Sequence, residues 1–251
     1  MMVIGSIDFV PRYLMISFSS FLTQGVNLVA SGVQKSLIVS GEGGLGKTYT
    51  VMKALNEKGL ENYSCFSGEE IPDSSGGYRV IKGFSTAKGL YRSLYENKDG
   101  ILVFDDCDSI LKDSTALNLL KGALDSHDER IISWNADMKD ELPRSFIFNG
   151  YVIFITNLSS SGLDKALLSR SIVIDVSMTE EQKIERMEYL ITQQEFLSDY
   201  SIEVKEDALQ FIKENLSIGK EISLRTLISI SKIRSNVEDW KPLAKYVLVG
   251  C

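Results

Sequence analysis

The sequence predicts an α/β fold in which a parallel β-sheet lies between helices and is followed by an all-helical region. Three observations support this prediction. Five short apolar runs rich in β-branched residues occur between residues 36 and 176. Helix-like stretches separate these runs, and the runs are apolar throughout rather than alternating, which is typical of parallel strands covered on both faces. After Ser177 the strand-like runs stop, and only helix-like segments follow.

Each element has its own local signal. "SLIVSG" is short, apolar and β-branched, as expected of a buried strand. "KTYTVMKALNEKG" has helical spacing of its apolar residues, and Gly59 is a plausible C-terminal stop. The predicted strands are 36–41, 78–83, 100–108, 150–157 and 171–176, and the predicted helices between them are 47–59, 86–97 and 114–126.

The C-terminal third contains four helix-like segments without an intervening strand. They are expected at 179–197, 205–216, 223–235 and 239–249. This change of pattern predicts two domains, an α/β core over residues 1–178 and a small helical domain over residues 179–251.

Composition limits the functional classes. The net charge of −7 argues against a generally basic nucleic-acid binder, although a local basic loop is compatible with it. The three cysteines form no CxxC pair, which favours reduced thiols in the cytoplasm and disfavours a zinc site, and Cys107 is interpreted as a packing residue. Residues 1–30 are apolar, but Asp8, Pro11 and Arg12 interrupt them. We therefore expect this segment to pack on the core rather than to enter a membrane.

The stretch "GEGGLGKT" from Gly41 to Thr48 matches the phosphate-binding pattern G-x-x-x-x-G-K-[ST]. Its glycines let the backbone turn so that N–H groups point at phosphate oxygens, and the following helix adds its N-terminal dipole. Lys47 is expected at the β- and γ-phosphates of ATP, and the Thr48 hydroxyl on Mg²⁺. The alternative is a plain glycine-rich turn. The expected nucleotide-binding residues are Gly41, Glu42, Gly43, Gly44, Leu45, Gly46, Lys47, Thr48 and Tyr49.

A second acidic element is expected in a protein with such a loop, and "ILVFDDCD" provides it. Asp105 is the candidate that holds Mg²⁺, through a water molecule, and Asp106 is the candidate that polarises the attacking water. The alternative is that both are solvated turn residues. Asp108 is the next candidate for the base if Asp106 does not serve.

With these motifs the chain resembles the AAA+ family of P-loop ATPases over nearly its whole length. "GEGGLGKT" is similar to the Walker A motif of that family and "ILVFDD" to its Walker B motif. The resemblance implies that Asn157, after "VIFIT", orients water and the γ-phosphate. It also implies that Arg170, in "LLSRS", is an arginine finger for a neighbouring subunit, and that Arg225, in "SLRTL", contacts phosphate from a helical lid.

The same resemblance implies ATP hydrolysis in a homo-oligomeric ring, most often of six subunits. The segments "KGFSTAKGLYRSLY" and "FNGYVIFITN" are further similar to small AAA+ proteins of large tailed bacteriophages. One departure is that the family usually has Glu where this chain has Asp106. The shorter side chain implies slower hydrolysis or a different position of the water.

Each transferred role has a structural alternative. Asn157 is also suited to capping the loop that follows it. Arg170 is also compatible with an ordinary surface arginine, and Arg144 is the nearest competitor for the finger. Arg225 is also compatible with the solvated face of a helix. His127, the only histidine, is interpreted as a surface residue.

Two loops are candidates for contact with a macromolecular substrate. Residues 81–86 follow the second predicted strand, where many AAA+ rings carry an aromatic pore loop, and Lys82 and Phe84 are the expected contacts. Residues 130–150 predict a β-hairpin with an acidic turn, which argues against tight phosphate contact. Trp134 and Phe146 are as compatible with pairing across this hairpin as with binding. A purely structural role remains open for both loops.

The sequence therefore predicts an ATPase that moves or remodels a macromolecule. One hypothesis is a motor acting on DNA in phage-type nucleic-acid metabolism. The alternatives are a protein remodeller or assembly factor, and a slow nucleotide-driven switch, which Asp106 favours. The chain carries no recognisable substrate-recruiting domain, so the choice between DNA and protein stays open.

Overall fold

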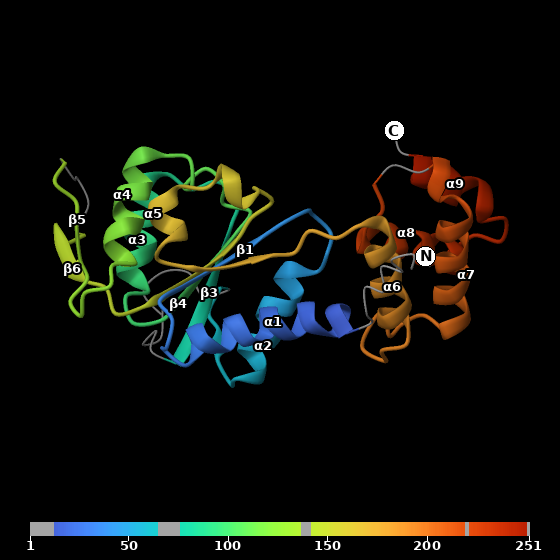
Figure 1. Cartoon of the computed structure of the whole chain (residues 1–251), viewed down its shortest axis with the longest axis horizontal. Coiled ribbons are helices and arrows are strands. Elements are labelled where there is room, and N and C mark those ends of the chain that lie inside the picture. Colours follow the sequence, from blue (N-terminus) through green and yellow to red (C-terminus); the bar gives the residue numbers. More distant parts are fainter. Residues whose placement is uncertain (1–12, 65–75, 137–141, 219–220, 250–251) are drawn as a thin grey trace, which may run out of the picture. The chain divides into compact units, whose positions relative to one another are not determined.

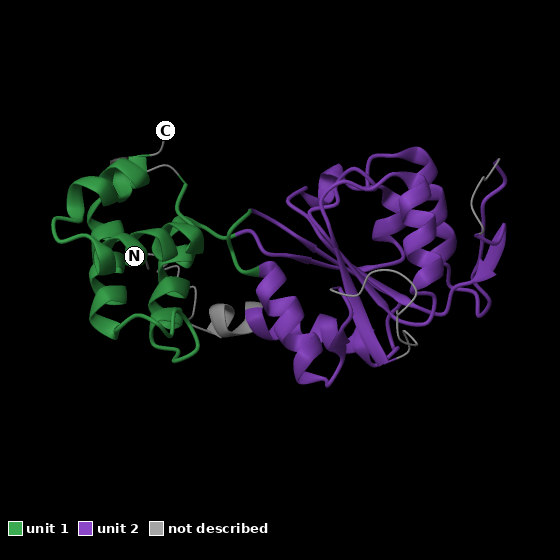
Figure 2. Ribbon diagram, turned by 180° about the vertical axis from the view of Figure 1, so that it is seen from behind, with its two compact units in different colours: residues 1–18, 43–46, 178–251 green, residues 19–42, 47–177 purple. Residues whose placement is uncertain are grey.

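The computed structural model describes residues 13–64, 76–136, 142–218 and 221–249. The chain divides into two compact units, coloured separately in Figure 2. One unit contains Ser19–Glu42 and Lys47–Ser177, and we call it the sheet unit. The other contains Met178–Cys251, Gly43–Gly46 and the chain up to Phe18, and we call it the helical unit. The sequence-based boundaries of 1–178 and 179–251 stay a prediction, because the glycine-rich Gly43–Gly46 segment groups with the later helices.

The sheet unit is built on a six-stranded sheet with the order β2-β3-β4-β7-β1-β8, and every adjacent pair is parallel. The strands are β1 (Ser36–Ser40), β2 (Glu61–Asn62), β3 (Gly77–Lys82), β4 (Ile101–Asp105), β7 (Tyr151–Ile155) and β8 (Ile172–Asp175). All residues of β1 and β4 are buried. These two strands lie inside the sheet, which explains why their sequences are apolar without alternation.

All five predicted strands are confirmed, but the prediction of five strands was one short. The additional strand, β2, has only the residues Glu61 and Asn62, and both are exposed. It lies at the edge of the sheet beside β3. A segment of two polar residues is too short, and lacks the apolar pattern, to be identified as a strand from the sequence.

Helices cover both faces of the sheet. Figure 1 shows α3, α4 and α5 together on one side of it and α1 and α2 on the other. The helices are α1 (Tyr13–Ala30), α2 (Lys47–Glu57), α3 (Ala87–Glu96), α4 (Ser114–Ala123) and α5 (Lys165–Leu168), with a 3-10 turn, η2, at Ser160–Gly162. Side-chain caps define the N-terminal ends of α3 and α4. Thr86 accepts a hydrogen bond from the amide of Gly89, and Asp113 accepts one from the amide of Ala116. The predicted helices 47–59, 86–97 and 114–126 are thus confirmed within a few residues.

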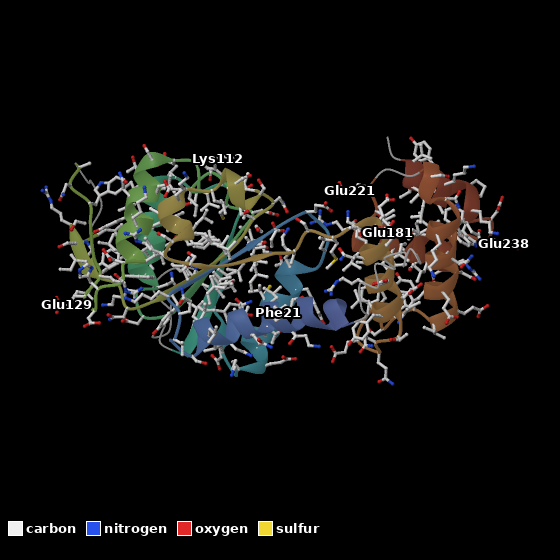
Figure 3. All side chains as sticks on the ribbon, in the orientation of Figure 1. Phe21, Lys112, Glu129, Glu181, Glu221 and Glu238 are labelled. Carbon is white, nitrogen blue, oxygen red and sulfur yellow. The ribbon has the colours of Figure 1, made fainter. Side chains whose placement is uncertain are left out.

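The α1 helix packs on the core through one face only. Leu22, Val26 and Val29 are fully buried, while Phe21, labelled in Figure 3, is 56% exposed. The expected core packing of the N-terminal segment is confirmed for Leu22, Val26 and Val29 but not for Phe21, and residues 1–12 lie outside the described residues. Among the described helices none has the length and apolar character needed to span a membrane.

The predicted hairpin is confirmed as β5 (Ile131–Ser133) and β6 (Ser145–Ile147), which pair antiparallel with Ile132 opposite Phe146. Its expected turn falls partly on 137–141, outside the described residues. The inner face packs on α3, because the rings of Trp134 and Phe146 lie 5.7 and 5.2 Å from that of Tyr91. Both aromatic residues therefore belong to the packing of the hairpin on the core.

The helical unit contains the four predicted helices in the expected order. They are α6 (Glu180–Ile191), α7 (Ile202–Glu214), α8 (Leu224–Asn236) and α9 (Lys241–Val249), with a 3-10 turn, η3, at Leu216–Ile218. Thr179 and Gln182 form a capping box that starts α6. The unit has its own apolar core, in which the rings of Phe211 and Trp240 lie 5.2 Å apart. This separate core explains why the sequence pattern changes after Ser177.

Candidate nucleotide-binding site

The candidate site lies where β1, β4 and β7 end. These strands are neighbours, and their register places Val39 and Asp105 on either side of Ile155. Segments that follow adjacent parallel strands meet at the same edge of the sheet, which is where ligands bind in such folds. The glycine-rich loop after β1, the acidic segment at the end of β4 and Asn157 after β7 therefore converge.

The loop after β1 has the backbone that its glycines permit. Gly41 and Gly46 have φ values of +124° and +83°, where other residues are strained. A Cβ at Gly41 would lie 2.9 Å from Cγ2 of Val176 and 3.1 Å from the backbone nitrogen of Ser177. The α2 helix starts directly at Lys47, so its N-terminal amides point into the loop. The backbone conformation of the glycines and the dipole at the N-terminus of α2 both suit the loop to phosphate binding.

Lys47 turns its ammonium group back into the loop. The residue is 6% exposed, and Nζ donates to the carbonyl oxygens of Gly41 at 2.5 Å and Glu42 at 2.7 Å. It also donates to Oδ1 of Asn157 at 2.9 Å. The loop thus holds a buried positive charge at its centre, in the position that a phosphate-binding lysine requires.

Thr48 and Asp105 meet beside this lysine. The Thr48 hydroxyl donates to Oδ1 of Asp105 at 2.9 Å, and Asp105 is 6% exposed. A hydroxyl and a carboxylate in contact are two of the oxygen ligands that Mg²⁺ prefers. Both residues were predicted from the sequence to bind Mg²⁺, and in the structure their side chains are in contact.

Asp106 and Asn157 form the next contact. Nδ2 of Asn157 donates to Oδ1 of Asp106 at 2.9 Å, while the amide oxygen of Asn157 accepts from Lys47. The ammonium only donates and the carboxylate only accepts, so this orientation of the amide is the one that satisfies both partners. Asp106 has φ +55°, a left-handed conformation that Asp tolerates better than most residues. A continuous chain therefore links Lys47, Asn157 and Asp106.

The residues after Asp106 are already engaged. Asp108 accepts a hydrogen bond of 2.6 Å from the hydroxyl of Thr156, a fully buried residue. Cys107 is 3% exposed, which agrees with its predicted packing role. Burial is the main cause that raises the pKa of the Cys107 thiol to about 11, and the negative charge of Asp105 is the second cause. Asp106 is the exposed acid of this segment, which makes it a better candidate than Asp108 for contact with water.

Arg170 is not brought to this site by its own chain. It precedes Ile172, which pairs with Leu37 at the start of β1, whereas Gly41 follows the end of that strand. At roughly 3.3 Å per residue, the four steps from Leu37 to Gly41 place these two levels about 13 Å apart along the sheet. The Arg170 side chain donates to the carbonyl oxygen of Ala166 at 3.0 Å. Its competitor Arg144 is exposed on the hairpin.

Two arginines of the helical unit lie close to the Gly43–Gly46 segment, which belongs to the same unit. A Cβ at Gly44 would lie 3.5 Å from Cγ of Arg225, so this arginine is next to the Gly43–Gly46 segment of its own unit. A Cβ at Gly46 would lie 3.8 Å from Nη2 of Arg186. Arg186, on α6, is 7% exposed, and burial lowers the pKa of its guanidinium. Sequence reasoning missed Arg186, because an arginine in a charged amphipathic helix gives no signal of burial.

The other loop candidates differ in exposure and contacts. Leu45 is 2% exposed, so only its backbone is available to a ligand, whereas Tyr49 is 62% exposed on α2. Phe84 is 81% exposed, as expected of a residue that contacts a partner. Lys82, however, lies with Nζ 3.3 Å from Oδ2 of Asp105, a contact that the sequence did not predict. His127 is confirmed as a surface residue with its side chain 80% exposed.

The donor set fits a magnesium-bound nucleoside triphosphate. A buried ammonium and helix N-terminal amides suit phosphate oxygens, and an adjacent hydroxyl and carboxylate suit Mg²⁺. A second acid held by an amide suits a water molecule beside the terminal phosphate. No cluster of three or more His, Cys, Asp or Glu side chains arranged for a metal is found among the described residues.

Comparison with known proteins agrees with this geometry. The sequence model of the ATPase family associated with various cellular activities (AAA) matches residues 37–178, which include β3, β4, β7, β8 and all of β1 except Ser36. The chain is also 30% identical over 238 residues to an uncharacterized 36.7 kDa protein in the nrdC-mobD intergenic region of Enterobacteria phage T4, covering 87% of this chain and 69% of that protein. The chain is thus similar to a protein of a bacteriophage, which is consistent with the expected resemblance to phage proteins. The chain belongs to the AAA family of ATPases.

Proposed function

We propose that this protein hydrolyses ATP to ADP and phosphate with Mg²⁺ and uses the reaction, as a ring oligomer, to move or remodel a macromolecule. The observation that carries the proposal is the chain of contacts from Lys47 through Asn157 to Asp106. The Thr48–Asp105 pair lies beside this chain. It joins a phosphate-binding cation, a polar positioning group and an exposed acid in one site, which are the parts that phosphoryl transfer to water requires.

Each residue has a defined task in this reaction. Lys47 offsets the charge of the terminal phosphates, and the loop amides bind their oxygens. Thr48 and Asp105 would hold Mg²⁺, which would supply positive charge beside the terminal phosphates. Asp106 accepts a hydrogen bond from the attacking water, and Asn157 fixes the direction of the Asp106 carboxylate.

The position of Arg170 supports the proposal of an oligomer. Arg170 lies near the start of β8, whereas Lys47 lies beyond the opposite ends of the strands. Its side chain therefore cannot reach phosphates bound by its own subunit without rearrangement. A neighbouring subunit in a ring, most often a hexamer, would supply it in trans. Arginine fingers in related reactions account for about 10³–10⁵ in rate.

The substrate is proposed to be DNA in phage-type nucleic-acid metabolism, contacted through Lys82 and Phe84. The phage relative supports the phage setting, and the exposed Phe84 supports contact with a partner. A protein remodeller is the alternative, which the net charge of −7 favours. A slow switch is the third candidate, favoured by the short Asp106 side chain at a left-handed backbone position.

Subunit mixing tests the ring. Arg170→Ala and Lys47→Ala should each lose nearly all hydrolysis alone and regain part of it when mixed, because each variant supplies what the other lacks at shared interfaces. Arg144→Ala, which alters an exposed arginine on the hairpin, is the matched control and should keep wild-type turnover. Specific activity that does not depend on protein concentration, together with an active Arg170→Ala variant, would contradict the ring.

The substrate is tested by adding one polymer at a time to the wild-type enzyme. Stimulation of ATP turnover by single-stranded or duplex DNA, lost in Phe84→Ala, supports a DNA motor. Stimulation by unfolded protein alone supports the remodeller. A slow basal rate that no polymer changes supports the switch.

A further inference from the structure

A lysine of the exposed loop reaches into the metal side of the site. Lys82 and Asp105 are direct partners in the register of β3 and β4. Nζ of Lys82 lies 3.3 Å from Oδ2 of Asp105, and the two side chains are 65% and 8% exposed. The contact is therefore specified by the pairing of two adjacent strands and not by a chance approach of a long side chain.

Asp105 has both carboxylate oxygens engaged. Oδ1 accepts from the Thr48 hydroxyl at 2.9 Å, and Oδ2 faces the Lys82 ammonium. The side chains of Lys82 and Tyr78 lie on the same face of β3, because they are four residues apart in the strand. On that face the Tyr78 hydroxyl donates to Asn56 of α2 at 2.8 Å. Lys82 thus points toward the sheet face that carries α2 and the metal ligands.

The loop that follows Lys82 is tied to the acidic segment along its length. The amide of Gly83 donates to the carbonyl oxygen of Asp105 at 3.3 Å. The amide of Ser85 donates to the hydroxyl of Ser109 at 3.3 Å, and that hydroxyl donates to the carbonyl oxygen of Ser85 at 3.2 Å. Phe84, 81% exposed, lies between these attachment points. Phe84 therefore lies in a loop that is hydrogen-bonded to the acidic segment on both sides of it.

We infer that Lys82 is a positioning residue that competes with Mg²⁺ for Asp105 and so couples metal binding to the loop 82–85. This inference rests on the proposed function. The ammonium and the metal ion are both cations that require the same carboxylate, and repulsion between them disfavours their joint binding. With Mg²⁺ at Asp105, Lys82 would leave that carboxylate and the loop 82–85 would loosen. By thermodynamic reciprocity, an anionic partner that holds Lys82 away from Asp105 strengthens magnesium binding.

The test measures Mg²⁺ affinity with a slowly hydrolysed fluorescent ATP analogue bound to the protein. Lys82→Met should bind Mg²⁺ about two- to fivefold more tightly than wild type, the range expected for a partly exposed ion pair. Lys82→Arg keeps the charge and should behave like wild type. Lys112→Met is the matched control and should change nothing. Lys112, labelled in Figure 3, is an exposed lysine on the loop after β4 and makes no ion pair with another described residue.

Hydrogen–deuterium exchange of the peptide that covers residues 82–86 gives a readout independent of catalysis. With the nucleotide analogue bound, addition of Mg²⁺ should speed exchange in the wild type. In Lys82→Met, exchange should already be fast before the addition. Equal magnesium affinity in wild type and Lys82→Met, with normal binding of the analogue by both, would overturn the coupling and leave the proposed function standing. Failure of the wild type to bind the analogue at all would overturn both.

Discussion

Asn157 gives the sharpest test of how the site is organised. Its side chain makes two hydrogen bonds of 2.9 Å, one with the charged Lys47 and one with the charged Asp106. Replacement by Ala removes both. Lys47 keeps the carbonyl oxygens of Gly41 and Glu42, so nucleotide binding should persist. Asp106 loses the group that fixes its direction, so the chemical step should slow.

The magnitude follows from the contact with Asp106. A hydrogen bond to a charged group is worth about 1.5–3 kcal/mol, and each 1.36 kcal/mol is about tenfold in rate. Because Asp106 is exposed to solvent, we place Asn157→Ala in the lower part of that range, at about a tenfold to thirtyfold loss of kcat. KM for ATP should change little. Asn157→Asp should be slower still, because it sets a second carboxylate against Asp106.

The assay is steady-state ATP hydrolysis with nucleotide affinity measured separately. Asn149→Ala is the matched control, since Asn149 is an exposed asparagine that donates to Asp99 at 2.8 Å outside the site. It should keep wild-type kcat and KM. A wild-type kcat in Asn157→Ala, or a loss confined to nucleotide affinity, would refute the role of Asn157 in holding Asp106.

Two further predictions concern the acidic segment. Asp106→Asn should bind ATP and leave it unhydrolysed, while Asp106→Glu should be tolerated; rapid-quench measurement of product checks both, and normal hydrolysis by Asp106→Asn would move the base elsewhere. Cys107, whose thiol pKa is raised to about 11, should resist iodoacetamide at pH 8, because about one thiol in a thousand is then a thiolate. Peptide mass spectrometry with and without denaturant checks this, and fast labelling of Cys107 in the native protein would contradict its burial.

The sequence was sufficient for the sheet because burial leaves a direct mark on composition. β1 and β4 are buried along their whole length, and both are continuous apolar runs. The glycine-rich loop was predictable for a similar reason, since Gly41 and Gly46 adopt backbone angles that few other residues accept. The strand β2 left no such mark, because its two residues are polar and exposed.

Side-chain partners were harder to predict, because they depend on which strands are neighbours. The contact between Asn157 and Asp106 requires β7 to lie beside β4. The contact between Lys82 and Asp105 requires the register of β3 against β4. Neither strand order nor register is written in a single sequence, so Lys82 was assigned only to substrate contact. Whether it also contacts a substrate stays a prediction.

The proposed function depends above all on binding of a magnesium nucleotide by Lys47 and its loop. The most direct measurement is titration of a fluorescent ATP analogue with Mg²⁺ into wild type and Lys47→Met, with circular dichroism to verify the fold of both. The account predicts saturable binding to the wild type and at least tenfold weaker binding to Lys47→Met at an unchanged fold, because a buried cation that faces the phosphates is lost. Equal affinity of the two proteins for the analogue would contradict it.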